Sequence, residues 1–239
     1  MRVLELFSGT ASFSNVAKDR GHETFTVDID PSFHPDMVAD IGKLWTDDLP
    51  EMWRHPDVVW ASPPCQCFSV AALYRNWQQV GEQYHPRRPE ATEAQNLVRH
   101  TLDLIREISP RFYFIENPRA MLRKFGMMNK LPKRRTVTYC KYGSKTMKPT
   151  DIWTNYYGWV PRPMCKPLDP CHEAAPRGSK KGVQGIVKHN EGKGWNATST
   201  PRVAALRAVV PPALCEEILV ACEGALLKQV NGFATEVPA

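Results

Sequence analysis

The chain has 239 residues and a mass of 27.1 kDa, enough for one domain with a sizeable hydrophobic core. Hydrophobic residues make up 42% and charged residues 23% of the chain, which is ordinary for a globular protein and excludes a disordered chain or a fibrous repeat. The formal net charge is +6, and because no apolar run reaches about 18 residues, no membrane-spanning helix is predicted.

Strands and helices alternate along residues 1–118. Each predicted strand is a short apolar run that ends in a chemically distinctive loop: SGT, DID, SPPCQ or ENP. This alternation indicates an open parallel α/β sheet, in which ligands bind at the carboxyl ends of the strands. Strands are expected at 2–7, 24–30, 57–62 and 111–117, and helices at 12–21 and 91–108.

The pattern changes beyond residue 119. Residues 135–143 still read as a strand, but 144–200 are rich in Pro, Gly, Lys and Trp without a clear period. A helix is predicted at 211–227, which begins with prolines and has apolar residues at helical spacing, so it should pack back onto the sheet. Three regions follow: an α/β domain at 1–144, a small loop-rich insert at 145–200 and a C-terminal segment at 201–239.

Two loops suggest a ligand site. Gly9, in the SGTAS loop, gives the backbone the freedom to approach a ligand closely. Asp28 ends the next strand, where nucleotide-binding βαβ units hold ribose hydroxyls. The strict G-x-G-x-x-G pattern is absent, so a purely structural turn is an equally good interpretation.

Cys65 is a candidate nucleophile. Pro63 and Pro64 fix the backbone before it and hold the thiol at the end of a strand. Such a thiol becomes reactive if a neighbour lowers its pKa or activates its target; otherwise it is an inert thiol on a tight turn. Glu116 ends another strand and could exchange a proton with a heterocycle that the thiolate attacks.

These residues resemble the ordered motifs of DNA cytosine-5 methyltransferases. The resemblance rests on Phe7-Ser8-Gly9, Pro63-Pro64-Cys65-Gln66 with Phe68-Ser69, and Glu116-Asn117-Pro118. The small size is similar to compact bacteriophage or prophage members. The resemblance implies a Rossmann-like S-adenosylmethionine-dependent methyltransferase sheet with a small target-recognition insert at 145–200.

The resemblance also implies a reaction and a set of site residues. A methyl group would pass from S-adenosylmethionine to carbon-5 of a cytosine flipped out of duplex DNA, through a covalent bond between Cys65 and C6. The implied catalytic residues are Cys65, Glu116, Asn117 and Arg135. The implied cofactor-binding residues are Phe7, Ser8, Gly9, Thr10, Ala11, Asp28, Ile29, Asp40, Ile41, Pro63, Ala208 and Val209. The expected DNA contacts are Gln66, Ser69, Arg134, Lys145, Lys148, Arg177, Lys180 and Lys181.

The sequence departs from the family pattern at three places. Ala11 and Ser12 replace a glycine pair, and Ala208 replaces an asparagine. The basic motif is reduced to Lys133-Arg134-Arg135, in which we assign the base-bracing arginine to Arg135.

A basic segment at 119–193 predicts the nucleic-acid face. It holds 17 Lys/Arg against 4 Asp/Glu, whereas the rest of the chain is acidic. Such a segment favours a polyanion, and aromatic side chains within it could stack on bases; a solvated, lysine-rich surface is the alternative. The aromatic residues are Tyr139, Tyr142, Trp153, Tyr156, Tyr157 and Trp159.

The seven cysteines are expected to be reduced thiols, because their number is odd and no leader precedes the first strand. Cys140, Cys165, Cys171 and His172 have irregular spacing without a CxxC pair, so thiols in a loop region are favoured over zinc and no metal is expected. The protein is expected to be a monomer in a bacterial or phage-infected host cytoplasm.

Two other functions stay open at this point. An RNA methyltransferase is the first, although the tRNA-modifying branch reads ENV where this chain has Glu116-Asn117-Pro118. A catalytically inactive DNA-binding relative is the second, supported by Ala11, Ser12 and Ala208. No target DNA sequence can be read from the chain, because base-reading loops follow no visible code.

Overall fold

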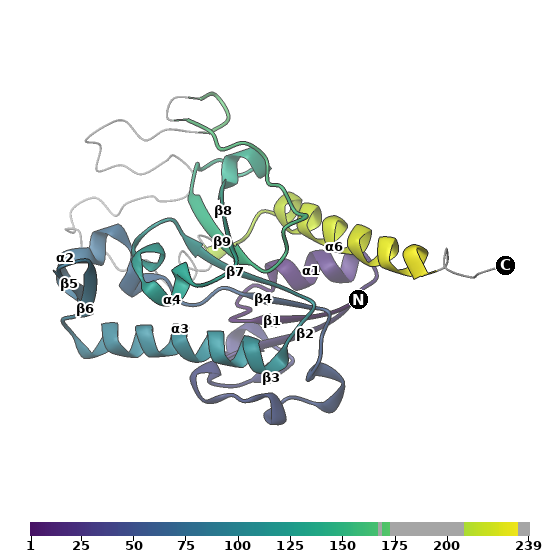
Figure 1. Cartoon of the computed structure of the whole chain (residues 1–239), viewed down its shortest axis with the longest axis horizontal. Helices are drawn as coiled ribbons and strands as arrows, with labels where there is room; N and C mark the ends of the chain where they lie inside the picture. The colour runs from purple at the N-terminus through teal and green to yellow at the C-terminus, as the bar shows by residue number, and fades with distance from the viewer. Residues whose placement is uncertain (167–168, 173–207, 234–239) are drawn as a thin grey trace.

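A seven-stranded sheet forms the centre of the structure, a computed structural model that describes residues 1–166, 169–172 and 208–233 (Figure 1). The strand order is β3-β2-β1-β4-β7-β9-β8. The first five strands are parallel, and β9 runs antiparallel to both β7 and β8. The strands are β1 (Arg2–Leu6), β2 (Glu23–Asp28), β3 (Met37–Val38), β4 (Val58–Ala61), β7 (Phe112–Pro118), β8 (Lys133–Thr138) and β9 (Pro149–Thr154).

Helices cover both faces of this sheet. Helices α1 and α6 lie on one side and the long α3 on the other (Figure 1). A separate antiparallel hairpin, β5–β6, precedes α3. These elements are α1 (Ser12–Asp19), α2 (Leu73–Asn76), β5 (Trp77–Val80), β6 (Gln83–Pro86), α3 (Pro89–Ile108), α4 (Gly126–Asn129) and α6 (Pro212–Phe233). Short 3-10 turns lie at 31–33, 41–43, 46–48, 51–53, 66–68, 70–72, 121–124 and 139–142.

The core is divided into two layers by the sheet. Along β1, Val3 packs with α1 and α6, whereas Leu4 packs with α3. Because both faces are covered, β4 needs no polar side and its four residues are all fully buried. Within the described ranges, none of the helices combines the length and apolar character required to span a bilayer.

The α/β class predicted from the sequence is confirmed, and the predicted strands and helices of residues 1–118 are present with ends that differ by one or two residues. Strand β9 was not predicted. It falls within 145–200, the range expected to be a loop-rich insert, yet it is inserted between β7 and β8. The central sheet therefore extends to Thr154, and residues 167–168 and 173–200 of that range lie outside the described residues.

The C-terminal helix α6 packs on α1. Buried side chains of α6, including Leu214 and Ile218, share a cluster with Phe13 of α1. Arg20, just after α1, donates to Glu223 of α6, with Nη2 2.7 Å from Oε2. The helix thus covers the same face of the sheet as α1.

Candidate active site

The loops after β1 and β4 leave the sheet side by side. In the parallel strand order β3-β2-β1-β4-β7, the order reverses between β1 and β4. A parallel sheet opens a crevice at such a reversal, at the carboxyl ends of its strands. This topology brings residues 7–11, residues 62–69 and the end of β7 to one edge of the sheet.

The loop after β1 has a left-handed backbone. Phe7, Gly9 and Ala11 have φ values of 58°, 47° and 53°, a region that costs a residue with a Cβ about 1–2 kcal/mol. A Cβ built on Gly9 would meet no atom within 4 Å, so open space lies beside this backbone. The loop therefore offers a close approach to a ligand.

Asp28 holds this loop in place. Its Oδ2 accepts the Gly9 N–H at 2.8 Å, and its Oδ1 accepts the Asp30 N–H at 2.9 Å. Each carboxylate oxygen has a second lone pair, which leaves acceptor capacity for a ribose hydroxyl. Asp28 thus shapes the loop in addition to being placed where the sequence predicts a ribose ligand.

The neighbouring predicted cofactor residues differ in exposure. The Ile29 side chain is 65% exposed, so its apolar face can cover an adenine. Asp40 Oδ1 accepts the Gly42 N–H at 3.0 Å and caps the 3-10 turn at 41–43. Ile41 is buried in the core, which leaves its backbone, rather than its side chain, to face a ligand.

The C-terminal segment returns to the loop after β1. The Val210 N–H donates to Ser12 Oγ at 3.3 Å, and the exposed Ala208 and Val209 precede it directly. Two departures from the family pattern, at Ser12 and Ala208, are therefore close together. The left-handed loop, the acid at the end of β2 and the exposed Ile29 fit the amino acid, ribose and adenine parts of S-adenosylmethionine.

Glu5 is a buried acid that sequence reasoning missed. Its Oε1 and Oε2 accept the Phe13 and Ser14 N–H groups at 3.3 and 2.7 Å, at the start of α1. Burial raises the pKa of Glu5 to about 7. Its only sequence signal was a charged residue in the middle of an apolar strand.

Cys65 and Glu116 are held close together. Glu116 Oε1 accepts the Tyr139 O–H at 2.8 Å, and Lys148 Nζ lies 4.0 Å from the same oxygen. Burial raises the pKa of Glu116. Burial, and next the negative charge of Glu116, raise the pKa of the Cys65 thiol. Lys148, whose positive charge lowers the pKa of the Cys65 thiol, has a smaller effect than burial and Glu116. The thiol therefore needs a target that is itself activated.

Asn117 connects the end of β7 to the loop that carries Cys65. Its Nδ2 donates to the carbonyl of Pro63 at 2.9 Å, which ties the end of β7 to the loop that carries Cys65. Its Oδ1 is buried and has no hydrogen-bond partner among the described residues. Buried polar atoms are normally satisfied, so this oxygen is available to a ligand.

Arg135, assigned to the base site from the sequence, lies on β8, and this assignment stays a prediction. Its Nη2 donates to the Tyr157 carbonyl at 3.3 Å. In the strand register, Ile152 of β9 lies between Arg135 and Glu116, which separates the two backbones by about 10 Å. Strand β9, which was not predicted from the sequence, therefore lies between the two residues.

Lys148 and Tyr139 both contact Glu116. Lys148, predicted to contact a DNA phosphate, instead has its Nζ beside Glu116 and 4.4 Å from the centre of the Tyr139 ring. Tyr139 was predicted only as a stacking face. In the sequence, both residues could be placed only near the end of the sheet. The tertiary structure alone shows that they meet at Glu116.

Most of the aromatic residues expected to stack on bases are in the core. Tyr157 is 60% exposed and can present a face to a partner, and Tyr156 is half-buried. The prediction is wrong for the four buried ones, because they pack between the sheet and its helices: Tyr139, Tyr142, Trp153 and Trp159.

The predicted DNA contacts are placed unevenly. Gln66, Arg134 and Lys145 are exposed, and Ser69 Oγ donates to the Gln66 carbonyl at 3.3 Å. The remaining predicted contacts lie outside the described residues: Arg177, Lys180 and Lys181.

Comparison with known proteins gives a consistent family. Residues 1–131 match the model of the C-5 cytosine-specific DNA methylases. The chain is 30% identical, over 93% of its length and 100% of the relative, to a protein of Frog virus 3 (isolate Goorha) named as a probable DNA (cytosine-5)-methyltransferase. It is also 28% identical to the type II methyltransferase M.AplI of Arthrospira platensis, over 51% of this chain and 32% of that protein.

Among solved structures, the methyltransferase EhMeth of Entamoeba histolytica is similar with a TM-score of 0.48 and 12% identity, over 68% of this chain and 55% of that one. The family match covers the loop after β1, the Cys65 loop and the end of β7, all within residues 1–131. The chain therefore belongs to the C-5 cytosine-specific DNA methylases, enzymes with a Rossmann-like sheet that take their methyl group from S-adenosylmethionine.

Proposed function

We propose that the chain methylates carbon-5 of cytosine in DNA, with Cys65 as nucleophile and Glu116 as the acid that holds the base. The observation that supports this most directly is the proximity of the two groups, close enough for the Glu116 charge to raise the pKa of the Cys65 thiol. The bond from Asn117 to the Pro63 carbonyl fixes their loops relative to each other. A nucleophile and an acid held in one crevice suit attack on an activated heterocycle.

The residues of the crevice between β1 and β4 would hold the cofactor. Asp28 would accept the ribose hydroxyls, and Ile29 would cover the adenine. The backbone of residues 7–11, with its left-handed turns at Gly9 and Ala11, would hold the amino acid end. S-adenosylmethionine supplies an electrophilic methyl group when bound there.

Glu116 is suited to activate the cytosine. Because burial raises its pKa, its carboxyl keeps a proton to higher pH than a solvated glutamate and can donate it to cytosine N3. Positive charge at N3 draws electrons from C6, where the Cys65 thiolate adds. The Tyr139 O–H, which bonds Oε1, orients the carboxyl for this contact.

Cys65 acts in the first and last steps. Its raised pKa keeps the thiol protonated near neutral pH without a substrate, and the thiol gives its proton to solvent when it adds to the activated base. Sγ then bonds C6, and carbon-5 gains electron density and takes the methyl group. S-adenosylhomocysteine is the leaving group of the methyl transfer. A base then takes the carbon-5 proton, the C5–C6 double bond forms again and Sγ leaves as a thiolate. The N3 proton returns to Glu116, and the thiolate takes up a proton from solvent to restore the thiol.

DNA is the proposed polymer. A cytosine in duplex DNA must be flipped out at a cost of a few kcal/mol. Exposed Gln66, Arg134 and Lys145 could contact the strand, and the rest of the basic segment at 119–193 would add phosphate contacts through residues outside the described ranges. The Glu116-Asn117-Pro118 sequence favours DNA over the RNA-modifying branch.

A mechanism-based trap tests this proposal. Fluorine at carbon-5 cannot leave as a cation, so DNA with 5-fluorocytosine and S-adenosylmethionine should give a denaturant-resistant adduct with the protein. Cys65→Ser should abolish the adduct, because a serine hydroxyl has no comparable nucleophilic form near pH 7. Cys67→Ser is the matched control and should keep it, and Glu116→Gln should slow it about 10²–10⁴-fold.

Three outcomes would contradict the proposal. An adduct on fluorinated RNA but not on DNA would assign the RNA reaction. An adduct that survives Cys65→Ser and disappears in Cys67→Ser would move the nucleophile. No adduct in the wild type, on DNA shown to bind, would favour an inactive DNA-binding relative; bisulfite sequencing of DNA from cells that express the chain would then show no new 5-methylcytosine.

A further inference from the structure

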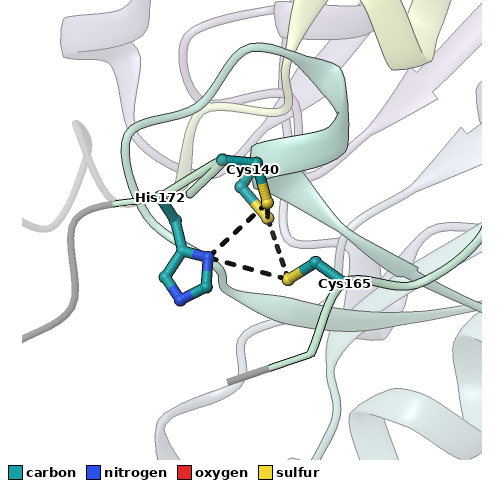
Figure 2. A group of neighbouring side chains, drawn as sticks. Cys140, Cys165 and His172 are labelled. Atoms are coloured by element: carbon teal, nitrogen blue, oxygen red, sulfur yellow. Dashed lines mark hydrogen bonds between the residues drawn. The ribbon is translucent and has the colours of Figure 1, made fainter. Parts of the chain in front are cut away.

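Four potential metal ligands converge beside the 3-10 turn at 139–142. The Sγ atoms of Cys140, Cys165 and Cys171 and a ring nitrogen of His172 all lie within 4.8 Å of one another. Figure 2 shows the Cys165 thiol and the His172 imidazole directed toward Cys140. The sequence favoured thiols in a loop region over a metal site, whereas in the structure two cysteines 25 residues apart in the chain meet here.

We propose that Cys140, Cys165, Cys171 and His172 bind one Zn²⁺ ion in a closed structural site. Three thiolates and one imidazole form a Cys₃His donor set, which is typical of tetrahedral zinc. Soft sulfur donors also select against Mg²⁺ and Ca²⁺, which prefer oxygen. Four protein ligands leave no open position for a water or substrate, so the site is structural rather than catalytic.

The distances fit a tetrahedron. Zinc bonds of about 2.3 Å to sulfur and about 2.0 Å to nitrogen place tetrahedral ligands about 3.6–3.8 Å apart. The Cys140–Cys171 sulfur separation is 3.6 Å, and His172 Nδ1 lies 3.8 and 3.7 Å from the sulfurs of Cys165 and Cys171. The Cys140–Cys165 separation of 3.1 Å is shorter, and it must open by about 0.6–0.7 Å when the ion enters.

A disulfide is the competing use of these thiols. The Cys140–Cys165 sulfurs, at 3.1 Å, are well beyond the bond length of about 2.05 Å. A disulfide between Cys140 and Cys165 would also leave the neighbouring Cys171 thiol and His172 imidazole without a role. A zinc ion uses all four groups, which is why the geometry favours it.

The surroundings support a structural role. Cys140 and Cys165 are buried, with 6% and 4% exposure, and the Cys165 N–H donates to Thr138 Oγ1 at 3.0 Å, which fixes that ligand to the end of β8. The other two ligands are on the described residues 169–172, which form only turn and bend. Metal binding supplies the free energy that such a segment lacks.

The charge of the proposed site follows from its ligands. Zn²⁺ displaces three thiol protons, which pass to solvent, and the resulting complex carries one net negative charge. Lys141 is the residue after Cys140, and its Nζ lies 3.8 Å from Asp169 Oδ2. A cation at this position offsets the charge of a trithiolate site.

The proposed site adjoins the catalytic crevice through one residue. Tyr139, which bonds Glu116, immediately precedes the ligand Cys140. A metal that fixes the turn at 139–142 therefore also fixes the tyrosine that orients the catalytic acid. The zinc would act as a positioning element, and this consequence, though not the zinc site itself, rests on the proposed function.

Metal analysis of the full chain tests the site. Protein purified under reducing conditions without chelator should contain about one zinc per chain. Replacement by Co²⁺ should give the visible bands of a tetrahedral ion together with thiolate-to-cobalt charge transfer. Cys171→Ser and His172→Ala should lose the metal, His172→Cys should retain it as a Cys₄ site, and Cys67→Ser, the matched control, should bind it as the wild type does.

The results that would refute the zinc site differ from those that would refute the methylation proposal. Wild-type protein that takes up neither Zn²⁺ nor Co²⁺ under reducing conditions would refute the site, even if the 5-fluorocytosine adduct forms. A Cys140–Cys165 disulfide detected by peptide mass mapping of protein prepared without oxidant would replace it. Metal that persists at wild-type level in Cys171→Ser, or a cobalt spectrum without thiolate charge transfer, would assign the ion to other ligands. Because the cobalt spectrum is recorded on the wild type, the test stands even if a variant fails to fold.

Discussion

The buried Glu5 carboxyl should make the stability of the protein depend on pH. Burial raises its pKa from 4.5 to about 7 in the folded chain. An acid with a raised folded pKa contributes its full stability below the unfolded pKa, and this contribution is lost as the pH rises through the folded pKa. Its ionisation should therefore destabilise the fold between about pH 4.5 and pH 7.

The size of the effect follows from the two pKa values. With about 4.5 in the unfolded and about 7 in the folded chain, the free energy of unfolding should fall by about 2.5 kcal/mol between about pH 5 and about pH 8 through Glu5 alone. Glu5→Gln stays neutral and should not show this fall. The variant should lose about 1 kcal/mol at acid pH, because its amide cannot accept both the Phe13 and the Ser14 N–H groups.

Urea unfolding at the two pH values measures the free energy of unfolding of wild type and of Glu5→Gln. In the difference between the two proteins, the contributions of the other titrating groups cancel. Glu107→Gln, at an exposed position of α3, is the matched control and should keep the wild-type dependence. If wild type and Glu5→Gln lose the same free energy between the two pH values, the burial argument for Glu5 is wrong.

Two further substitutions address the crevice. Tyr139→Phe removes the O–H that favours ionised Glu116, so the pKa of Glu116 should rise and the alkaline limb of the adduct-formation rate should move up by about one to two pH units; an unmoved limb would separate Tyr139 from the acid. Asp28→Ala removes the acceptor of the Gly9 N–H and a ribose ligand, so calorimetry should show S-adenosylhomocysteine binding about 10- to 150-fold more weakly, and unchanged affinity would take Asp28 out of the site.

The sequence by itself determined the parallel half of the fold. Strands β1, β2, β4 and β7 are short apolar runs that end in polar loops. This pattern is local, so it can be recognised without knowing how the rest of the chain is arranged. Their carboxyl ends must share an edge once they are parallel, so the grouping of Gly9, Asp28, Cys65 and Glu116 followed from the pattern. The family motifs lie in this half for the same reason.

Only the tertiary structure decided the second half of the site. Strand β9 enters the sheet between β7 and β8, and no local pattern in 149–154 announces an antiparallel strand in that place. Its insertion places Ile152 between Arg135 and Glu116 in the strand register. Lys148 and Tyr139 contact Glu116.

Only the tertiary structure likewise shows that four possible metal ligands meet: Cys140, Cys165, Cys171 and His172. Spacing along the chain argued against a metal, because local zinc motifs bring ligands together through short loops. In this fold the hairpin β8–β9 and the segment after it bring distant residues within 4.8 Å of one another. Contacts between residues far apart in sequence depend on how the whole chain packs, and that packing is the information the sequence pattern does not show directly.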